Sequence, residues 1–172
     1  MEGCGVEYYG AVGVWVGFAR ETVISHNLIH DLPYSGISVG WQWNPKLTPC
    51  RENVIERNHI HDVMKRLGDG GGIYTLGFQP GTVIRGNHIH DVRRSRFAQA
   101  APNNGMFIDE GSKGFLFERN VIYNTAAGLV RFNQCKREWH TWRDNHFGKP
   151  DEVKKAGKEI IATAGLESPY RE

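Results

Sequence analysis

The chain has 172 residues, of which 23% are charged, and a formal net charge of +2 at pH 7. This length suits one domain, and the small net charge without a basic cluster argues against a nucleic-acid partner. The three cysteines, Cys4, Cys50 and Cys135, fit neither a closed disulfide framework nor a zinc-ligand spacing. No apolar run is long enough to span a membrane.

The chain enters strand-like sequence almost at once. Its first residues, Met1-Glu2-Gly3-Cys4, lack the basic start and apolar core of a signal peptide. The segment from Val6 to Phe18 already has the character of the later repeats. Because the end repeat of a solenoid exposes its apolar interior, we expect missing N-terminal coils of a longer parent chain, or an oligomer partner, to cover this end.

A motif with the pattern Ile-x-x-Asn-x-Ile-His-Asp then returns about every 30 residues. A Gly and an alternating apolar run follow most copies, as in Gly36-Ile-Ser-Val-Gly40, and no helical period lies between copies. Two or three short strands per repeat predict an all-β chain, a right-handed parallel β-helix with about five coils over residues 1–148. The motif asparagines are Asn27, Asn58, Asn87, Asn120 and Asn145.

Stacked coils bring equivalent residues together at the interstrand spacing of about 4.8 Å. We expect the second isoleucine of the motif to point into the core, as Ile29, Ile60, Ile89 and Ile122. Each Asn should lie at a bend, where its amide bonds backbone groups of its own and the adjacent coil. His30, His61 and His90 recur just as regularly, which favours a stacked surface ladder over a metal site.

Two long inserts, within residues 62–72 and 91–105, break the repeat. Long loops on one side of a solenoid usually form its binding face. Asp69 lies in a glycine-rich insert, and Asp109 and Glu110 end a strand where apolar or small residues are expected. Paired carboxylates on an open groove suggest glycoside hydrolysis. The alternative is that Asp69 is a turn residue and the other two acids bind backbone amides or Ca²⁺.

Aromatic residues near these acids favour a sugar ligand. Trp41 and Trp43 follow a strand, and Tyr74 and Phe107 should face outward from theirs. Exposed aromatic faces offer apolar area of fixed geometry, which suits stacking on a pyranose ring. Either tryptophan could instead pack beneath its loop. His140, near the last coil, is a candidate rim residue. We expect no cofactor and no metal.

The C-terminal region, residues 149–172, has a different pattern. Residues 151–164 begin with Asp-Glu, place apolar residues at helical spacing from Val153 to Ile161, and stop at Gly165. Repeat proteins need caps at their ends. We therefore predict a short capping helix that folds over the last coil, followed by a tail.

Several stretches together resemble the right-handed parallel β-helix glycoside hydrolases of the pectate-lyase-like superfamily, bacterial enzymes on plant polysaccharides with α-L-fucosidase and xylan-active members. The stretches are Tyr8-Tyr-Gly-Ala-Val-Gly-Val-Trp-Val-Gly17, Leu32-Pro-Tyr-Ser-Gly-Ile-Ser-Val-Gly-Trp41, Asp69-Gly-Gly-Gly-Ile-Tyr-Thr-Leu-Gly77-Phe-Gln-Pro-Gly81, Asp109-Glu-Gly-Ser112 and Ala164-Gly-Leu-Glu-Ser-Pro-Tyr-Arg171. The resemblance implies a poly- or oligosaccharide substrate and an extracellular or periplasmic location. It also implies a catalytic acid pair, which maps to Asp69 and to Asp109 or Glu110.

Two other functions remain open on this architecture. A polysaccharide lyase needs a base, often Lys or Arg, and a group that neutralises the uronate carboxylate. Cations in the two inserts could supply these: Lys65, Arg66, Arg93, Arg94 and Arg96. The second alternative is a carbohydrate-binding or purely structural solenoid fragment without catalytic activity.

Overall fold

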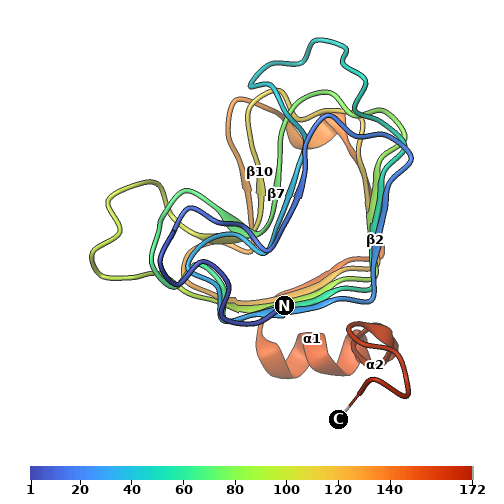
Figure 1. Cartoon of the computed structure of the whole chain (residues 1–172). Helices are drawn as coiled ribbons and strands as arrows, with labels where there is room; N and C mark the ends of the chain where they lie inside the picture. The colour runs from blue at the N-terminus through green and yellow to red at the C-terminus, as the bar shows by residue number, and fades with distance from the viewer. Residues whose placement is uncertain (172) are drawn as a thin grey trace.

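The computed structural model describes residues 1–171, which form a parallel β-helix of three five-stranded sheets (Figure 1). Each of the five coils contributes one strand to each sheet, in chain order. The first sheet contains β1 (Val14–Val16), β4 (Ile37–Val39), β7 (Gly71–Thr75), β10 (Asn104–Ile108) and β13 (Val130–Phe132). The second contains β2 (Val23–Ser25), β5 (Val54–Glu56), β8 (Val83–Arg85), β11 (Leu116–Glu118) and β14 (Thr141–Arg143). The third contains β3 (Leu28–His30), β6 (His59–His61), β9 (His88–Val92), β12 (Val121–Thr125) and β15 (His146–Phe147).

The predicted isoleucine ladder forms the middle of the core. Ile29, Ile60, Ile89 and Ile122 pair in register across the third sheet and are fully buried. A glycine at or next to the start of each of the first four strands of the first sheet makes room for them. A Cβ at Gly72 would collide with Cγ2 of Ile89, and one at Gly105 with Cγ2 of Ile122. The repeat therefore needs both its Ile and its Gly, because the two meet inside the coil.

The asparagine ladder is confirmed as well. Asn58, Asn87 and Asn120 are fully buried at the bend between the second and third sheets. The Asn58 amide nitrogen donates to the Ile24 carbonyl of the coil before it and to Oδ1 of Asn87 in the coil after it, each at 3.0 Å. The Asn58 backbone N–H also donates to Oδ1 of Asn87 at 3.0 Å. Each side chain thus links three consecutive coils.

The third sheet ends in a second bend at the Asp of the motif. Asp31, Asp62 and Asp91 have φ of 56°, 50° and 51°, a left-handed conformation that Asp and Asn tolerate better than most residues. Each carboxylate bonds Nδ1 of the preceding histidine, at 2.8, 3.0 and 2.6 Å. These histidines stack with ring centroids 4.8 and 5.1 Å apart, which confirms the ladder of His30, His61 and His90.

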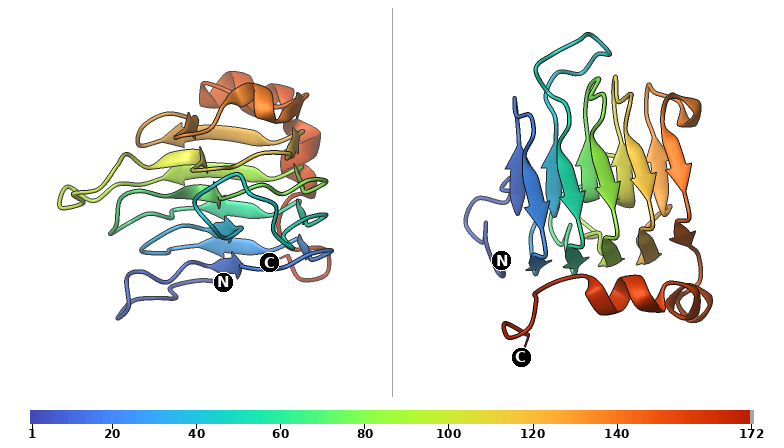
Figure 2. Two further views of the ribbon diagram at one scale, coloured as in Figure 1. Left: turned by 90° about the horizontal axis from the view of Figure 1, so that it is seen from above. Right: turned by 90° about the vertical axis from the view of Figure 1, so that its right-hand side faces the viewer.

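The C-terminal region is helical as predicted, but it lies elsewhere than expected. α1 (Pro150–Ala156) and α2 (Lys158–Thr163) run along the outer face of the third sheet instead of across the end of the last coil (Figures 1 and 2). Val153 and Ile160 are buried there against Val121 and Tyr123, which point outward from β12. These apolar outward positions explain the difference, because they need a cover that the sheet alone lacks. Neither helix is long and apolar enough to cross a membrane.

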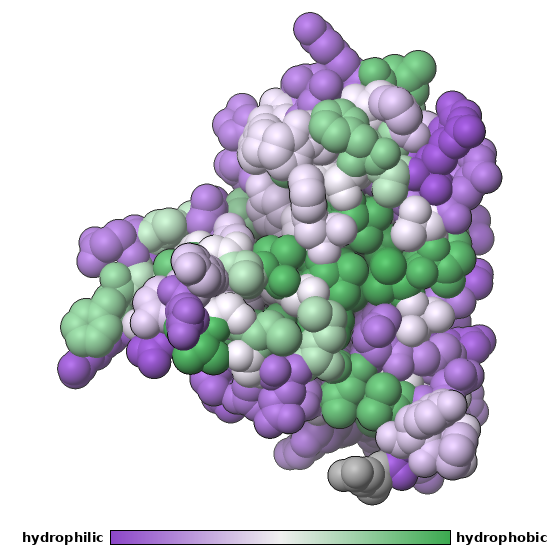
Figure 3. Space-filling view, viewed as in Figure 1, coloured by the Kyte–Doolittle hydropathy of each residue, from purple (hydrophilic) through white to green (hydrophobic). Residues whose placement is uncertain are grey.

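The face of the first coil is apolar at its centre. Figure 3 views the solenoid from this end and shows hydrophobic residues gathered in the middle of the face. Several large apolar side chains near this end are more than half exposed, including Trp15, Phe18 and Val23. The expectation that further coils or a partner cover this end stays a prediction.

Candidate functional site

The sequence-predicted acids lie along the outer face of the first sheet. In Figure 1 this sheet lies between the loop around residues 40–50 at the top and the loop around residues 92–103 at the left. Because side chains alternate along a strand, one outward residue from each coil joins a single row. The register of the sheet gives this row as Trp15, Ser38, Tyr74, Phe107 and Arg131.

Asp109 follows β10 and is held by side chains from the coils on either side. The Tyr74 hydroxyl donates to Oδ2 at 2.5 Å, and the Asn133 amide donates to Oδ1 at 2.7 Å. Asp109 is only 6% exposed. Burial, and then the bond to Asp109, raise the pKa of Tyr74 against the opposing effect of a Trp43 hydrogen bond. The Tyr74 hydroxyl therefore keeps its proton and remains a donor to the carboxylate.

Asp69 lies in the insert before β7, in a left-handed conformation with φ of 64°. Its side chain is half exposed, and Oδ1 lies 3.9 Å from Nη1 of Arg131. The Arg131 guanidinium in turn lies 4.4 Å above the ring of Phe107. Arg131 therefore connects Asp69 to the outward row that carries Tyr74.

Tyr34 provides a second link between the two acids. Its hydroxyl donates to the Asp69 carbonyl at 2.9 Å. Burial raises the pKa of Tyr34, and the negative charges of Asp69 and Asp109 raise it further. Both carboxylates therefore act on the same hydroxyl, while the expected convergence of the two acids stays a prediction.

An open cavity adjoins Asp69. It has a volume of about 500 Å³ and is lined by Tyr34, Asp69 and residues of both inserts, among them Leu67, Phe97 and Ala100. The Asp69 backbone N–H donates to the Ala101 carbonyl at 2.8 Å, so the two inserts are joined at this point. The inserts thus form one wall beside Asp69.

Glu110 has a different neighbour from Asp109. Its carboxylate accepts a hydrogen bond from the Gln134 amide at 2.7 Å and is partly buried. Gln134 belongs to the coil after Glu110, so this bond joins the last two coils. Asp109, by contrast, bonds both Tyr74 and Asn133.

The aromatic residues divide into an exposed group and a buried one. Trp41 lies at the centre of the exposed group, with its ring centroid 5.5 Å from Trp15, 5.2 Å from Trp43 and 5.9 Å from Phe18. Trp43 is 51% exposed. Phe107 faces outward as expected, yet it is fully buried because Tyr74 and Arg131 cover its ring. The expectation that Phe107 offers a stacking face is therefore wrong.

His140 does not join the acids. Its ring packs on Phe115 and Phe117, with centroids 5.7 and 5.4 Å away, at the end of the core. Both ring nitrogens are buried without a hydrogen-bond partner. Burial lowers the pKa of His140 to about 4. It is a packing residue of the last coils, so its expected role at the rim is wrong.

Three residues of the site were missed by the sequence analysis: Arg131, Asn133 and Tyr34. A signal for Arg131 was present, because it occupies an outward position of the alternating run Gly128-Leu-Val-Arg-Phe132. The cations of the inserts were the expected alternative, but several of them have structural partners. Lys65 bonds Asp31, Arg93 bonds Asp62, and Arg94 bonds the carbonyls of Ala98, Ala100 and Ala101.

Among the described residues, two groups could hold a metal ion: His59 with His88 and His90, and Glu2 with His30 and Asp31. Both belong to the third sheet or its borders, whereas Asp69 and Asp109 border the first sheet. The acids themselves are engaged with Arg131, Tyr74 and Asn133.

Comparison with known proteins agrees with this architecture. A solved structure named "Glycoside hydrolase" is similar, with a TM-score of 0.78 and 28% sequence identity. The alignment covers 97% of this chain and 26% of that chain, so the present chain spans about a quarter of the length of its neighbour. No curated protein matches the chain. A family model described as "Right handed beta helix region" matches residues 1–166, and the chain belongs to this family.

Proposed function

We propose that the chain hydrolyses a glycosidic bond of a plant-type poly- or oligosaccharide on the outer face of its first sheet, with Asp69 and Asp109 as the acid pair. One observation carries the proposal: Asp109 is buried and bonded by Tyr74 and Asn133 on a face that also holds Asp69. The similarity to the structure named "Glycoside hydrolase" supports it.

The bonds of Asp109 suit a group that must be accurately placed. Tyr74 and Asn133 each occupy one of its two oxygens, so the carboxylate cannot rotate freely. Catalysis gains most when the reacting groups are held in a near-attack geometry. In this proposal Asp109 attacks the anomeric carbon or removes a proton from the water that attacks it.

Asp69 is the candidate proton donor. It is 52% exposed at the edge of the cavity, so a glycan can reach it and its proton can be replaced from solvent. Its proton passes to the glycosidic oxygen as the bond from that oxygen to the anomeric carbon breaks. Water supplies the new hydroxyl at the anomeric carbon and restores the acid. Arg131, 3.9 Å from Asp69, fixes the position of this carboxylate.

The exposed tryptophans are the candidate sugar platform. Trp15 and Trp43 are 58% and 51% exposed, and both contact Trp41. Rings fixed against one another lose little entropy when a pyranose stacks on them. This platform also favours a second candidate function, glycan binding without turnover, because stacking needs no acid.

The test measures reducing ends released from soluble plant polysaccharides, together with ultraviolet absorbance of the products. The variants are Asp109→Asn and Asp69→Asn, and the matched control is Asp144→Asn. Asp144 is exposed and has φ of 46°, so asparagine fits it as it fits Asp69. We expect turnover in the wild type and the control, and a loss of at least about 100-fold in both site variants.

The other outcomes separate the alternatives. Glycan binding by all four proteins without release of reducing ends would replace hydrolysis by binding alone. Products that absorb in the ultraviolet carry a new double bond and would identify a lyase. Full activity of Asp69→Asn would remove Asp69 from the acid pair.

A further inference from the structure

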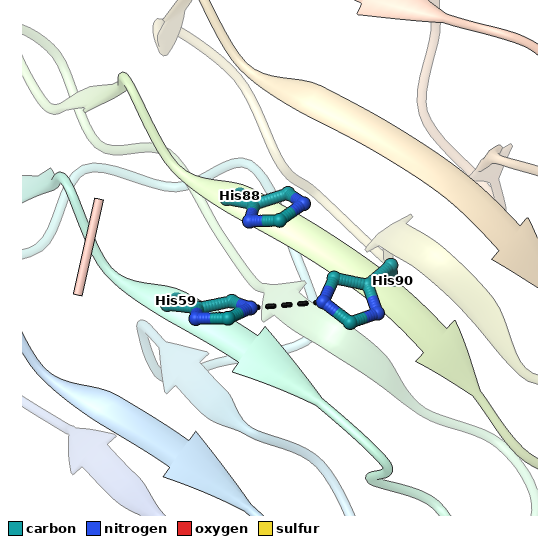
Figure 4. Close-up of side chains that lie close together, drawn as sticks. All are labelled: His59, His88 and His90. Atoms are coloured by element: carbon teal, nitrogen blue, oxygen red, sulfur yellow. Dashed lines mark hydrogen bonds between the residues drawn. The ribbon is translucent and has the colours of Figure 1, made fainter. Parts of the chain in front are cut away.

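Three histidines meet on the outer face of the third sheet, away from the proposed acid pair. His59 lies in β6, and His88 and His90 lie in β9, the adjacent strand (Figure 4). Nε2 of His59 is 2.8 Å from Nε2 of His90, and the rings of His59 and His88 stack with centroids 4.5 Å apart. Each residue offers one ring nitrogen, and the three atoms lie within 4.8 Å of one another.

The orientation of His90 is set by a carboxylate. Its Nδ1 lies 2.6 Å from Oδ2 of Asp91, an acceptor, so Nδ1 carries the proton. The lone pair of Nε2 is then free and faces His59. A carboxylate that fixes the tautomer and direction of a histidine in this way is the usual partner of a metal-binding histidine. Arg93, 3.4 Å from Asp91, steadies that carboxylate.

The three imidazoles are withdrawn from solvent: His88 is buried, and His59 and His90 are partly buried. Burial lowers the pKa of His59 to about 3 and that of His88 to about 2, and it lowers the pKa of His90 as well.

An open cavity reaches one member of the cluster, His59. A cavity of about 440 Å³ lies between the third sheet and the C-terminal segment, and His59 lines it together with Leu28, Ile161 and Tyr170. A small hydrated cation fits this space. The cavity also leaves room for a water molecule as an additional ligand.

We propose that His59, His88 and His90 bind one divalent transition-metal ion, with Zn²⁺ as the representative probe. Imidazole nitrogen suits zinc, copper and nickel, whereas magnesium and calcium prefer oxygen ligands. Zinc–nitrogen bonds of about 2.0–2.1 Å place tetrahedral ligands roughly 3.3 Å apart. The stacked rings of His59 and His88 must therefore tilt toward a common point when the ion binds. The His59 proton moves from Nε2 to Nδ1 when the metal binds, so the ligand stays a neutral imidazole.

The proposed site has a structural consequence for the C-terminal segment. The Gly165 N–H donates to the Arg57 carbonyl at 2.7 Å, two residues before His59. A metal at His59 therefore stabilises the start of β6, next to the residue on which this segment rests. An ion that binds only the folded chain raises its melting temperature by mass action.

The test titrates chelator-treated full chain with ZnCl₂ by calorimetry and follows its thermal unfolding, with MgCl₂ as the control ion. The variants are His59→Gln and His90→Gln. The matched control is His146→Gln, because His146 continues the His59–His88 row two coils further along the third sheet. We expect one zinc ion per chain and a higher Tm in the wild type and control, with affinity lowered about 10-fold or more in both variants.

Two results would overturn the proposal: no zinc-dependent rise in Tm, or unchanged affinity in both variants. If the glutamine variants fail to fold, X-ray absorption on the zinc-loaded wild type decides by counting ligands. Three imidazoles support the site, and fewer contradict it. Asp91→Asn keeps the three ligands and should weaken binding about 10-fold. None of these readouts depends on the proposed hydrolysis, so the two proposals succeed or fail separately.

Discussion

Replacing Asn87 by alanine tests the asparagine ladder at a fully buried position in the middle coil. Asn87 is fully buried, and its amide nitrogen donates to the Ile55 carbonyl at 2.9 Å and to Oδ1 of Asn120 at 3.0 Å. Its Oδ1 accepts from the backbone N–H and the amide of Asn58, both at 3.0 Å. Asn87→Ala therefore removes four side-chain hydrogen bonds and leaves donors of Asn58 without a partner.

The expected cost follows from these four bonds. At about 0.5–1.5 kcal/mol each, Asn87→Ala should lower the free energy of unfolding by about 2–6 kcal/mol. The matched control is Asn27→Ala in the first coil. Asn27 is partly exposed, and its side chain makes two bonds, to the Ser25 carbonyl at 3.0 Å and to Oδ1 of Asn58 at 2.9 Å. Water can replace these partners, so the control should lose about 1 kcal/mol.

Urea denaturation followed by far-ultraviolet circular dichroism measures both variants. We expect the midpoint of Asn87→Ala to fall well below that of Asn27→Ala, with similar slopes. Costs that agree within about 0.5 kcal/mol would show that bonding across coils does not set the stability of the ladder.

Three further predictions address the core, the candidate site and the response to acid. Ile60→Ala removes a fully buried side chain from the isoleucine ladder and should cost about 2–5 kcal/mol in urea denaturation; a cost below about 1 kcal/mol would show that the coil collapses around the cavity. Tyr74→Phe removes the 2.5 Å bond to Asp109. A hydrogen bond to a charged group is worth about 1.5–3 kcal/mol, so kcat should fall about 10- to 100-fold on a substrate that the wild type cleaves. Unchanged kcat would exclude a positioning role for Tyr74. Burial lowers the pKa of His140 in the folded chain to about 4, below the usual 6.5. As the pH drops from about 6.5 to 4, His140 is therefore protonated in the unfolded chain before it is in the folded chain, and the free energy of unfolding falls. His140→Leu should reduce the stability lost between pH 7 and pH 5, as urea midpoints at both pH values will show, and an unchanged loss would contradict this assignment.

The repeat made most of the fold predictable from sequence. Ile60 and Ile89 are two residues beyond Asn58 and Asn87, and one pattern fixes both the direction of each isoleucine and the bend at each asparagine. Local backbone preferences repeat with the same period, so five copies of one motif stack in register. The terminal helix was visible for a similar reason, since its apolar spacing is a local property.

The placement of that helix was not visible, because it depends on surfaces formed by distant residues. Val121 and Tyr123 become an outward apolar patch only after β12 pairs with β9, and Val153 and Ile160 then cover it. The expected position of His140 at the rim was wrong for a related reason. The ring of His140 packs on Phe115 and Phe117, which belong to a different coil.

The candidate site shows the same division between sequence and structure. The sequence by itself singled out Asp69, Asp109 and Glu110, because acids that interrupt a repeat stand out against its pattern, and it left open whether Asp109 or Glu110 is the second acid. Only the tertiary structure decided which residues surround them. Arg131 reaches Asp69, and Asn133 reaches Asp109, because parallel strands in register bring residues more than twenty positions apart into one row. Such contacts depend on the stacking of whole coils, which no local pattern of residues specifies.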